Sequence, residues 1–302
     1  MERINTLNQH YRARFGEKIY KLSLDGGFTC PNRDGTIGTG GCIFCSAGGS
    51  GDFAADRSLT IKEQICVAKN IFTAKNTGKK YIAYFQAFTN TYGPLSYLNK
   101  IYHEALEPND IVGISIGTRP DCLPPDTMKL LEKLNLEKPV YLELGLQTCH
   151  EKTAKFIRRG YPLSVFEDAV FRAKSAGLNV VVHIILGLPG ETDDMILETI
   201  HYLNTLPVDG IKMSMLHVLK HTDLADYYYQ TGFPVYEQDE YIDLVIDCLE
   251  RLRKDIVIHR MTGDGPKDLL IAPLWSLNKR AVLNGIQKRL KERNTWQGRK
   301  EG

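Results

Sequence analysis

Short apolar segments alternate with helical patterns along most of this chain, and that alternation constrains the fold more than any other feature of the sequence. A strand, a helix and a second strand in succession form a parallel pair joined by a right-handed crossover. The strand segments are nearly unbroken apolar runs, which indicates a sheet covered on both faces. The predicted strands are 19–24, 81–85, 111–116, 140–146, 180–186, 211–216 and 256–259.

Helical patterns fill most of the intervals between these strands. Thr60 and Glu63 have the spacing of a capping box, which predicts a helix from this point to about residue 76. Six or seven strand–helix units fit either a partial barrel or a doubly wound sheet. The other predicted helices are 95–107, 126–134, 163–176, 193–205 and 238–254.

Polar residues, glycines and prolines follow the predicted strands. In parallel α/β folds the carboxyl ends of the strands open on one face, and ligands bind there. We therefore expect the functional residues to gather at this edge of the sheet. The segments in question are 86–90, 117–121, 147–150, 187–190, 217–220 and 260–265.

Three cysteines lie in a Gly- and Thr-rich loop after the first predicted strand, at the same edge. Two residues separate Cys42 from Cys45, and eleven separate Cys30 from Cys42. Three thiolates on one loop can hold three irons of a four-iron cluster and leave the fourth iron open to a small molecule. A structural zinc site needs four ligands. No histidine lies between residues 11 and 102, so zinc would require a distant fourth ligand. Both metals remain open at this point.

Composition indicates a reducing compartment and no membrane span. The other four cysteines are scattered, which is not the pattern of a secreted disulfide framework. The N-terminus is too polar for a signal peptide, and no apolar run is long enough to cross a bilayer. We expect a cytoplasmic protein.

Charge is unevenly placed. The net charge of the chain is only +2, but residues 279–300 hold eight basic residues and one acidic residue. This basic segment has two interpretations: a surface for phosphate groups of a nucleic acid, or an ordinary charged helix face. Val282, Ile286 and Leu290 recur every fourth residue, which predicts a helix that docks on the body of the protein.

Taken together, these motifs resemble the radical S-adenosylmethionine (SAM) superfamily, in the branch related to the catalytic subunit of Elongator. Within that branch the chain resembles a small bacterial family of Elongator-like proteins. The resemblance spans residues 15–265 and includes Phe44 directly before Cys45, the stretch Thr118-Arg119-Pro120-Asp121 and the stretch 143–148. The first cysteine gap departs from the family pattern, since it has eleven residues where the family has three.

The resemblance implies an α/β fold with a partial (β/α)6 TIM-like barrel and extensions at both ends. Under this interpretation residues 1–18 form an N-terminal arm and residues 19–270 form the barrel. Residues 271–302 form a basic C-terminal helix that packs on the barrel.

The resemblance also implies a site. Cys30, Cys42 and Cys45 hold one [4Fe–4S] cluster, and SAM binds the free iron. The segment after the second strand stands where the family has a Gly-Gly-Glu motif, which is absent here. Arg159 has the spacing of an arginine that pairs with the SAM carboxylate. The residues implied in SAM binding are Phe44, Gln86, Asn90, Arg119, Glu143, Gln147, Arg159 and Leu188.

Several of these residues have purely structural interpretations. Arg159 is also placed to act as a cation at a helix C-terminus, and Glu143 to pair with a lysine inside a strand. His183, in the middle of a strand, fits a hydrogen-bonded core histidine. The substrate candidates are His259 and Arg260 at the last strand end, with Cys122 and Cys149 as hydrogen-atom donors or simply as buried thiols.

The implied activity is reductive cleavage of SAM to a 5′-deoxyadenosyl radical, with tRNA as the partner and the 5-side chain of wobble uridine as the target. An electron donor such as flavodoxin or ferredoxin is then required. The chain ends near residue 302, so we expect no acetyltransferase domain of the Elongator type. The alternatives are a radical SAM enzyme for a small molecule or a protein, and a non-catalytic, zinc-stabilised RNA-binding module.

Overall fold

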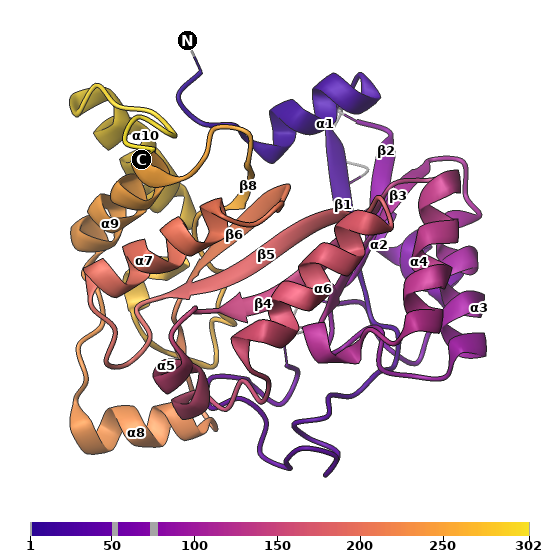
Figure 1. The fold of residues 1–302 in the computed structure, drawn as a ribbon, viewed down its shortest axis with the longest axis horizontal. Coiled ribbons are helices and arrows are strands. Elements are labelled where there is room, and N and C mark those ends of the chain that lie inside the picture. Colours follow the sequence, from indigo (N-terminus) through magenta and orange to yellow (C-terminus); the bar gives the residue numbers. More distant parts are fainter. Residues whose placement is uncertain (1, 50–53, 73–77, 302) are drawn as a thin grey trace.

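A seven-stranded parallel sheet forms the centre of the molecule (Figure 1). The computed structural model describes residues 2–49, 54–72 and 78–301. The strands follow the order β1-β2-β3-β4-β5-β6-β8 across the sheet. They are β1 (Ile19–Leu24), β2 (Lys80–Phe85), β3 (Ile111–Thr118), β4 (Val140–Gln147), β5 (Asn179–Leu186), β6 (Gly210–Met215) and β8 (Val257–Arg260). A short antiparallel pair is formed by β7 (Val218–Leu219) and β9 (Leu270–Ala272).

The sequential order of the strands distinguishes between the two architectures that the sequence allows. Each crossover moves to the next position in the same direction, and right-handed crossovers then place all connecting helices on one side of the sheet. A doubly wound sheet reverses its strand order at a switch point, and this sheet does not. The sheet curls into a half-barrel, which confirms the predicted partial barrel. The edge strand β8 makes it one strand larger than a six-unit barrel.

All seven predicted strands are present, and five of the predicted helices begin and end within about three residues of the observed ones. The helix predicted from residue 60 to about residue 76 is shorter than expected, because it ends at Asn70. The capping box at Thr60 and Glu63 forms as expected. The end of that predicted helix, residues 73–77, lies outside the described residues. The helices are α1 (Leu7–Phe15), α2 (Ile61–Asn70), α3 (Leu95–Leu106), α4 (Pro125–Glu137), α5 (Glu151–Phe156), α6 (Leu163–Ser175), α7 (Asp193–Asn204), α8 (Asp223–Thr231), α9 (Gln238–Arg251) and α10 (Lys279–Glu292), with the 3-10 turn η1 (Pro120–Cys122). Among them, no helix is long and apolar enough to cross a membrane.

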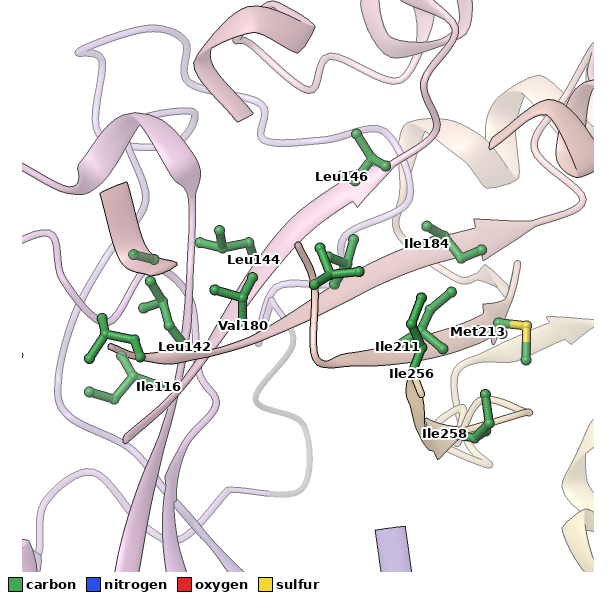
Figure 2. Close-up of a cluster of buried hydrophobic side chains, with 14 of the residues drawn as sticks. Ile116, Leu142, Leu144, Leu146, Val180, Ile184, Ile211, Met213, Ile256 and Ile258 are labelled. Carbon is green, nitrogen blue, oxygen red and sulfur yellow. The ribbon is translucent and has the colours of Figure 1, made fainter. Parts of the chain in front are cut away.

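Side chains alternate between the two faces of the sheet, as the strand geometry requires. On β4, Leu142, Leu144 and Leu146 belong to the apolar face that packs under the helices (Figure 2). The intervening Glu143 and Gly145, with Gln147 at the end of the strand, line a cavity on the inner side of the half-barrel. The outer face therefore provides the main core, and the inner face carries the polar groups.

The N-terminal segment closes one end of the half-barrel. Tyr11 of α1 is 1% exposed, and its ring meets Tyr141 of β4 edge-on at 5.7 Å between centroids. Ile82 and Val181 belong to the same buried cluster. The segment before α1 also bridges to β8 through Thr6 and Ile258. In Figure 1, α1 lies at one end of the sheet, whereas α5 and α8 lie at the other.

The basic C-terminal helix α10 docks on α9 through an apolar stripe and a set of ion pairs. Val282, Ile286 and Leu290 are fully buried. Arg289 pairs with Asp243 of α9, and Arg293 pairs with Asp243 at 2.6 Å and Asp247 at 3.0 Å. Of the eight basic residues in 279–300, five form ion pairs within the described chain. Much of the positive charge in this segment is thus neutralised inside the molecule.

We predict that the apolar stripe dominates this docking. Leu290→Ala should lower the free energy of unfolding by about 2–5 kcal/mol, because it removes buried methyl groups and leaves a cavity. Arg289→Gln should lower it by about 1 kcal/mol at low salt, since partly exposed ion pairs contribute little. Denaturant unfolding in low and in molar salt measures both effects. Only the Arg289 effect should fade at high salt, where charges are screened. An Arg289 effect larger than that of Leu290→Ala contradicts this ranking.

Candidate active site

A cavity of about 270 Å³ opens at the carboxyl ends of the strands, inside the half-barrel. We call it the central cavity. Strands β2 to β6 and β8 all contribute to its lining, together with the loop that follows β1. Of the residues predicted from the sequence, it brings together Cys30, Cys42, Phe44, Cys45, Gln86, Arg119, Glu143, Gln147, Arg159 and Arg260.

The long gap between Cys30 and Cys42 folds back on itself. The Arg33 amide donates to the Cys30 carbonyl at 2.8 Å, which turns the chain directly after the first cysteine. The Gly41 amide donates to the Asn32 carbonyl at 2.7 Å and returns the chain to its starting point. Gly41 has φ +71°, and a Cβ there would lie 3.0 Å from the Arg33 side chain, so this position favours glycine. The extra residues therefore form an excursion and leave Cys30 and Cys42 on the same cavity wall.

The cysteine loop, residues 30–49, is anchored to the opposite rim of the half-barrel. Asn32 is 4% exposed, and its side-chain amide donates to the Arg158 carbonyl at 2.7 Å. The same nitrogen lies 3.6 Å from Cys42 Sγ. The Ile43 amide donates to the Ile157 carbonyl, and the Ile43 carbonyl accepts from the Leu224 amide at the start of α8. These contacts fix the middle of the loop against α5 and α8.

The three thiols of the cysteine loop all line the central cavity. Within the described ranges, no group of three or more His, Cys, Asp or Glu side chains converges as ligands of one ion. A four-iron cluster does not need such convergence, because each thiolate binds its own iron. A hydrogen bond from the Cys45 thiol lowers the pKa of Cys42 to about 7, and the nearby Arg119 and Arg33 act in the same direction. The same hydrogen bond, together with burial, raises the pKa of Cys45, so only Cys42 of this pair favours the thiolate. A lowered pKa favours the thiolate, which is the form that binds metal.

Two guanidinium groups on the cavity wall are already held by protein groups. Arg119 pairs bidentately with Asp121, at 2.9 and 2.8 Å, and donates to the Arg159 carbonyl at 2.9 Å. Arg159 is 1% exposed and donates to the carbonyls of Leu146, Thr148 and Tyr161. Its remaining nitrogen faces Glu151 at 3.3 Å. Arg159 therefore ties the end of β4 to the turn that follows α5.

The cavity rim holds strained backbone. Phe88, Gln147 and Arg158 have φ values of 59°, 67° and 57°, in the left-handed region that residues other than glycine rarely adopt. Phe88 and Gln147 line the cavity, and β4 pairs irregularly with β5 between Gly145 and Gln147. Strain of this kind clusters at functional sites, where the surrounding structure enforces it.

Glu143 lies on the floor of the central cavity and is fully buried. Both of its carboxylate oxygens contact other side chains. Oε1 lies 2.7 Å from Lys21 Nζ and 2.5 Å from Ser115 Oγ. Oε2 contacts His183 Nε2 at 2.8 Å and pairs with Lys212. Although burial acts to raise it, the two lysines hold the pKa of Glu143 well below its usual range. The carboxylate thus stays ionised.

Tyr84 joins this group through Lys212, whose ammonium lies 3.0 Å from the phenol oxygen. The Lys21 and Lys212 ammonium groups both sit over the Tyr84 ring, at 4.9 and 4.4 Å from its centroid. Burial lowers the pKa of His183 to about 4, so its ring is neutral at neutral pH. We call the six residues the Glu143 network: Lys21, Tyr84, Ser115, Glu143, His183 and Lys212.

Five of the predicted site residues lie outside the lining of the central cavity. Asn90 is fully buried, and its side chain donates to the carbonyls of Phe85 and Gly117. Leu188 packs in a separate apolar cluster with Ile43. The remaining three are His259, buried at Nδ1, and the thiols Cys122 and Cys149. The proposed roles of these five in SAM or substrate binding stay predictions.

The sequence analysis missed several residues that the structure brings to the site. Arg33 crosses the cysteine loop and donates to the Ser46 carbonyl at 2.5 Å. Asn32 and Tyr161 hold the rim, and Lys21 and Lys212 hold the cavity floor. Part of the signal for the floor was present in the sequence, because Lys21 and Lys212 are charged residues within the otherwise mostly apolar segments of β1 and β6.

Comparisons with known proteins agree on one family. The family model of the radical SAM superfamily matches residues 33–203, and that of the radical SAM C-terminal domain matches residues 208–292. The uncharacterized protein YtqA of Bacillus subtilis (strain 168) is 47% identical over 298 residues, which cover 99% of this chain and 92% of the relative. A tRNA uridine(34) acetyltransferase of Methanocaldococcus jannaschii is 24% identical over 163 residues, 53% of this chain and 30% of the relative.

A solved structure shares the architecture. The archaeal Elp3 of Methanocaldococcus infernus, with its N-terminus deleted, superposes with a TM-score of 0.71 at 16% sequence identity. The match covers 92% of this chain and 64% of that chain. The partial barrel is thus shared at the level of the fold.

We predict that the Glu143 network is essential to stability. Glu143→Gln keeps the shape of the side chain but leaves Lys21 and Lys212 without their counterion, so the free energy of unfolding should fall by about 3–5 kcal/mol. Urea unfolding measures the change. Glu132→Gln on the exposed face of α4 is the matched control and should stay within about 0.5 kcal/mol of the parent chain. Equal effects of the two substitutions contradict the assignment.

Proposed function

The chain belongs to the radical SAM superfamily, and from this membership we propose that it is an enzyme that binds one [4Fe–4S] cluster and SAM in the central cavity and modifies tRNA. One observation carries the proposal. Three cysteines from one loop line the same cavity as the carboxyl ends of the barrel strands. No fourth cysteine belongs to the lining that the described residues form, so the site offers three thiolates and one open iron.

Cys30, Cys42 and Cys45 would hold the cluster. When bound and reduced, the cluster supplies one electron to SAM, and SAM cleavage provides the radical that abstracts hydrogen from the substrate. The chain itself would bind and orient SAM and the substrate, and it would exclude water from the cavity. Phe44, Gln86 and Gln147 face the cavity from three different segments and are proposed to contact SAM.

Arg119 and Arg159 are proposed to act differently from each other. The Arg159 guanidinium donates to backbone carbonyls and pairs with Glu151. We therefore propose that Arg159 positions the strained turn at Gln147. Arg119 is 8% exposed and keeps its guanidinium on the cavity wall near the thiols. Asp121 partly offsets its positive charge, but that charge still lowers the pKa of Cys42, and we propose that it also favours the carboxylate of SAM.

The proposal of a tRNA substrate rests on the named relatives. The Methanocaldococcus jannaschii relative is named as a tRNA uridine(34) acetyltransferase, and wobble uridine is the corresponding target proposed here. The charge of α10 supports it less than the sequence indicates, because α9 neutralises much of that charge. This internal pairing favours, as the second candidate, a radical SAM enzyme for a small molecule. Either reaction requires a reductant such as flavodoxin or ferredoxin.

We predict that Cys42→Ala abolishes SAM cleavage. The loss of one of three iron ligands should lower 5′-deoxyadenosine formation by at least about 100-fold in anaerobically reconstituted protein, together with the absorbance of the cluster near 400 nm. Cys66→Ala is the matched control, because Cys66 is exposed on α2 and far from the loop in sequence. Cluster absorbance and 5′-deoxyadenosine formation that survive in the Cys42 variant exclude it as a ligand.

We predict a change in tRNA nucleosides when the gene is deleted. Mass spectrometry of nucleosides from total tRNA should show the loss of one modified wobble uridine or the accumulation of its precursor. The parent chain should restore the profile, and the Cys42→Ala variant should not. Identical profiles in the presence and absence of the gene remove the tRNA substrate and leave the small-molecule candidate.

A further inference from the structure

A second, smaller chamber of about 170 Å³ opens beside the central cavity. It lies between the ends of β6 and β8 and the loop that follows β8. The two spaces share six wall residues, Phe44, Gly49, Gln86, Ile185, Ser214 and Arg260. A group seated in the second chamber therefore adjoins whatever the central cavity holds.

Arg260 lies on the wall between the two spaces, and few of its N–H donors have a partner among the described residues. Its only ion pair within the described residues is with Asp264, at 3.6 Å, which is too long for a hydrogen bond. Asp264 itself is held by Lys279 of α10, at 2.7 Å. The Arg260 side chain is 31% exposed, so its planar guanidinium remains open toward a ligand.

His217 provides a second polar group in the same chamber. Its Nε2 atom is buried and has no hydrogen-bond partner among the described residues. The loop after β8 encloses the ring, and a Cβ on Gly263 would lie only 2.5 Å from His217 Cε1. Burial lowers the pKa of His217 to about 4, so one nitrogen of the neutral ring donates and the other accepts. A buried polar atom without a partner is costly unless a ligand satisfies it.

The charges around the second chamber suit a single negative charge. Arg260 and Lys279 together exceed Asp264 by one positive charge. Apolar side chains line another part of the chamber: Phe44, Ile185, Met215, Leu216 and Leu219. A carboxylate matches both the charge and the planar geometry of the guanidinium, whereas a phosphate dianion exceeds the available charge.

We propose that the second chamber is the substrate subsite and that it binds a carboxylate of the substrate through Arg260, with His217 as a further hydrogen-bonding partner. This inference rests on the proposed function, because it places the substrate beside the bound SAM. It narrows the substrate class to molecules or modified nucleosides that carry a short side chain ending in a carboxylate.

Saturation-transfer NMR with propionate as the probe tests the proposal on the full chain, reconstituted anaerobically and loaded with SAM. Propionate should bind, and Arg260→Gln should weaken its binding by about tenfold or more, because a charged hydrogen-bonded pair is lost. His217→Gln should weaken it by a smaller factor. Arg280→Gln, which removes an exposed cation from α10, is the matched control and should bind propionate as the parent chain does.

Four further outcomes separate the alternatives. Propionamide that binds as well as propionate, or inorganic phosphate that binds better, overturns the carboxylate assignment. Unchanged propionate binding in an Arg260→Gln variant that retains the parent's unfolding temperature overturns the subsite. Arg260-dependent binding combined with unchanged tRNA nucleosides supports the chamber and rejects only the tRNA substrate. Altered nucleosides without propionate binding support the proposed function and reject the chamber.

Discussion

The buried carboxylate of Glu143 holds the inner face of the half-barrel together. Through its two oxygens it contacts side chains from β1, β3, β5 and β6, and Lys212 extends the contacts to Tyr84 on β2. The concave side of an open half-barrel is not covered by the helices, so side chains must fill it. Here a satisfied charge network does so, and removing one partner would leave buried charges unpaired.

The chemistry of the site depends on this arrangement. The network forms a firm floor below the central cavity, and Arg159 fixes the rim through backbone carbonyls. Between floor and rim, the strained turn at Gln147 and the anchored cysteine loop present their groups to one space. Cationic side chains outnumber free carboxylates around this space, which favours thiolates and the acidic ligands that we propose.

The basic C-terminal segment shows that the charge of a stretch of sequence does not by itself predict the charge of a protein surface. Residues 279–300 are strongly basic, and this suggests a contact with phosphate groups. In the fold, the acidic face of α9 lies against that helix, so that Arg289 and Arg293 meet Asp243 and Asp247. The partners are about fifty positions apart in the chain, and only helix packing brings them together.

The sequence by itself determined the seven strands of the main sheet, most of the helices, the parallel architecture and the placement of Cys30, Cys42 and Cys45 at the carboxyl edge of that sheet, because periodicity and spacing are local properties. Helices α1, α5 and α8 were not predicted, since each is short. Tertiary structure alone decided which polar residues meet. Glu143, His183 and Lys212 come from three strands, and the curl of the sheet sets their contacts. Asn90 and Leu188 are not part of the cavity lining. Whether a side chain points into the cavity depends on the three-dimensional path of the backbone, which the sequence pattern does not give.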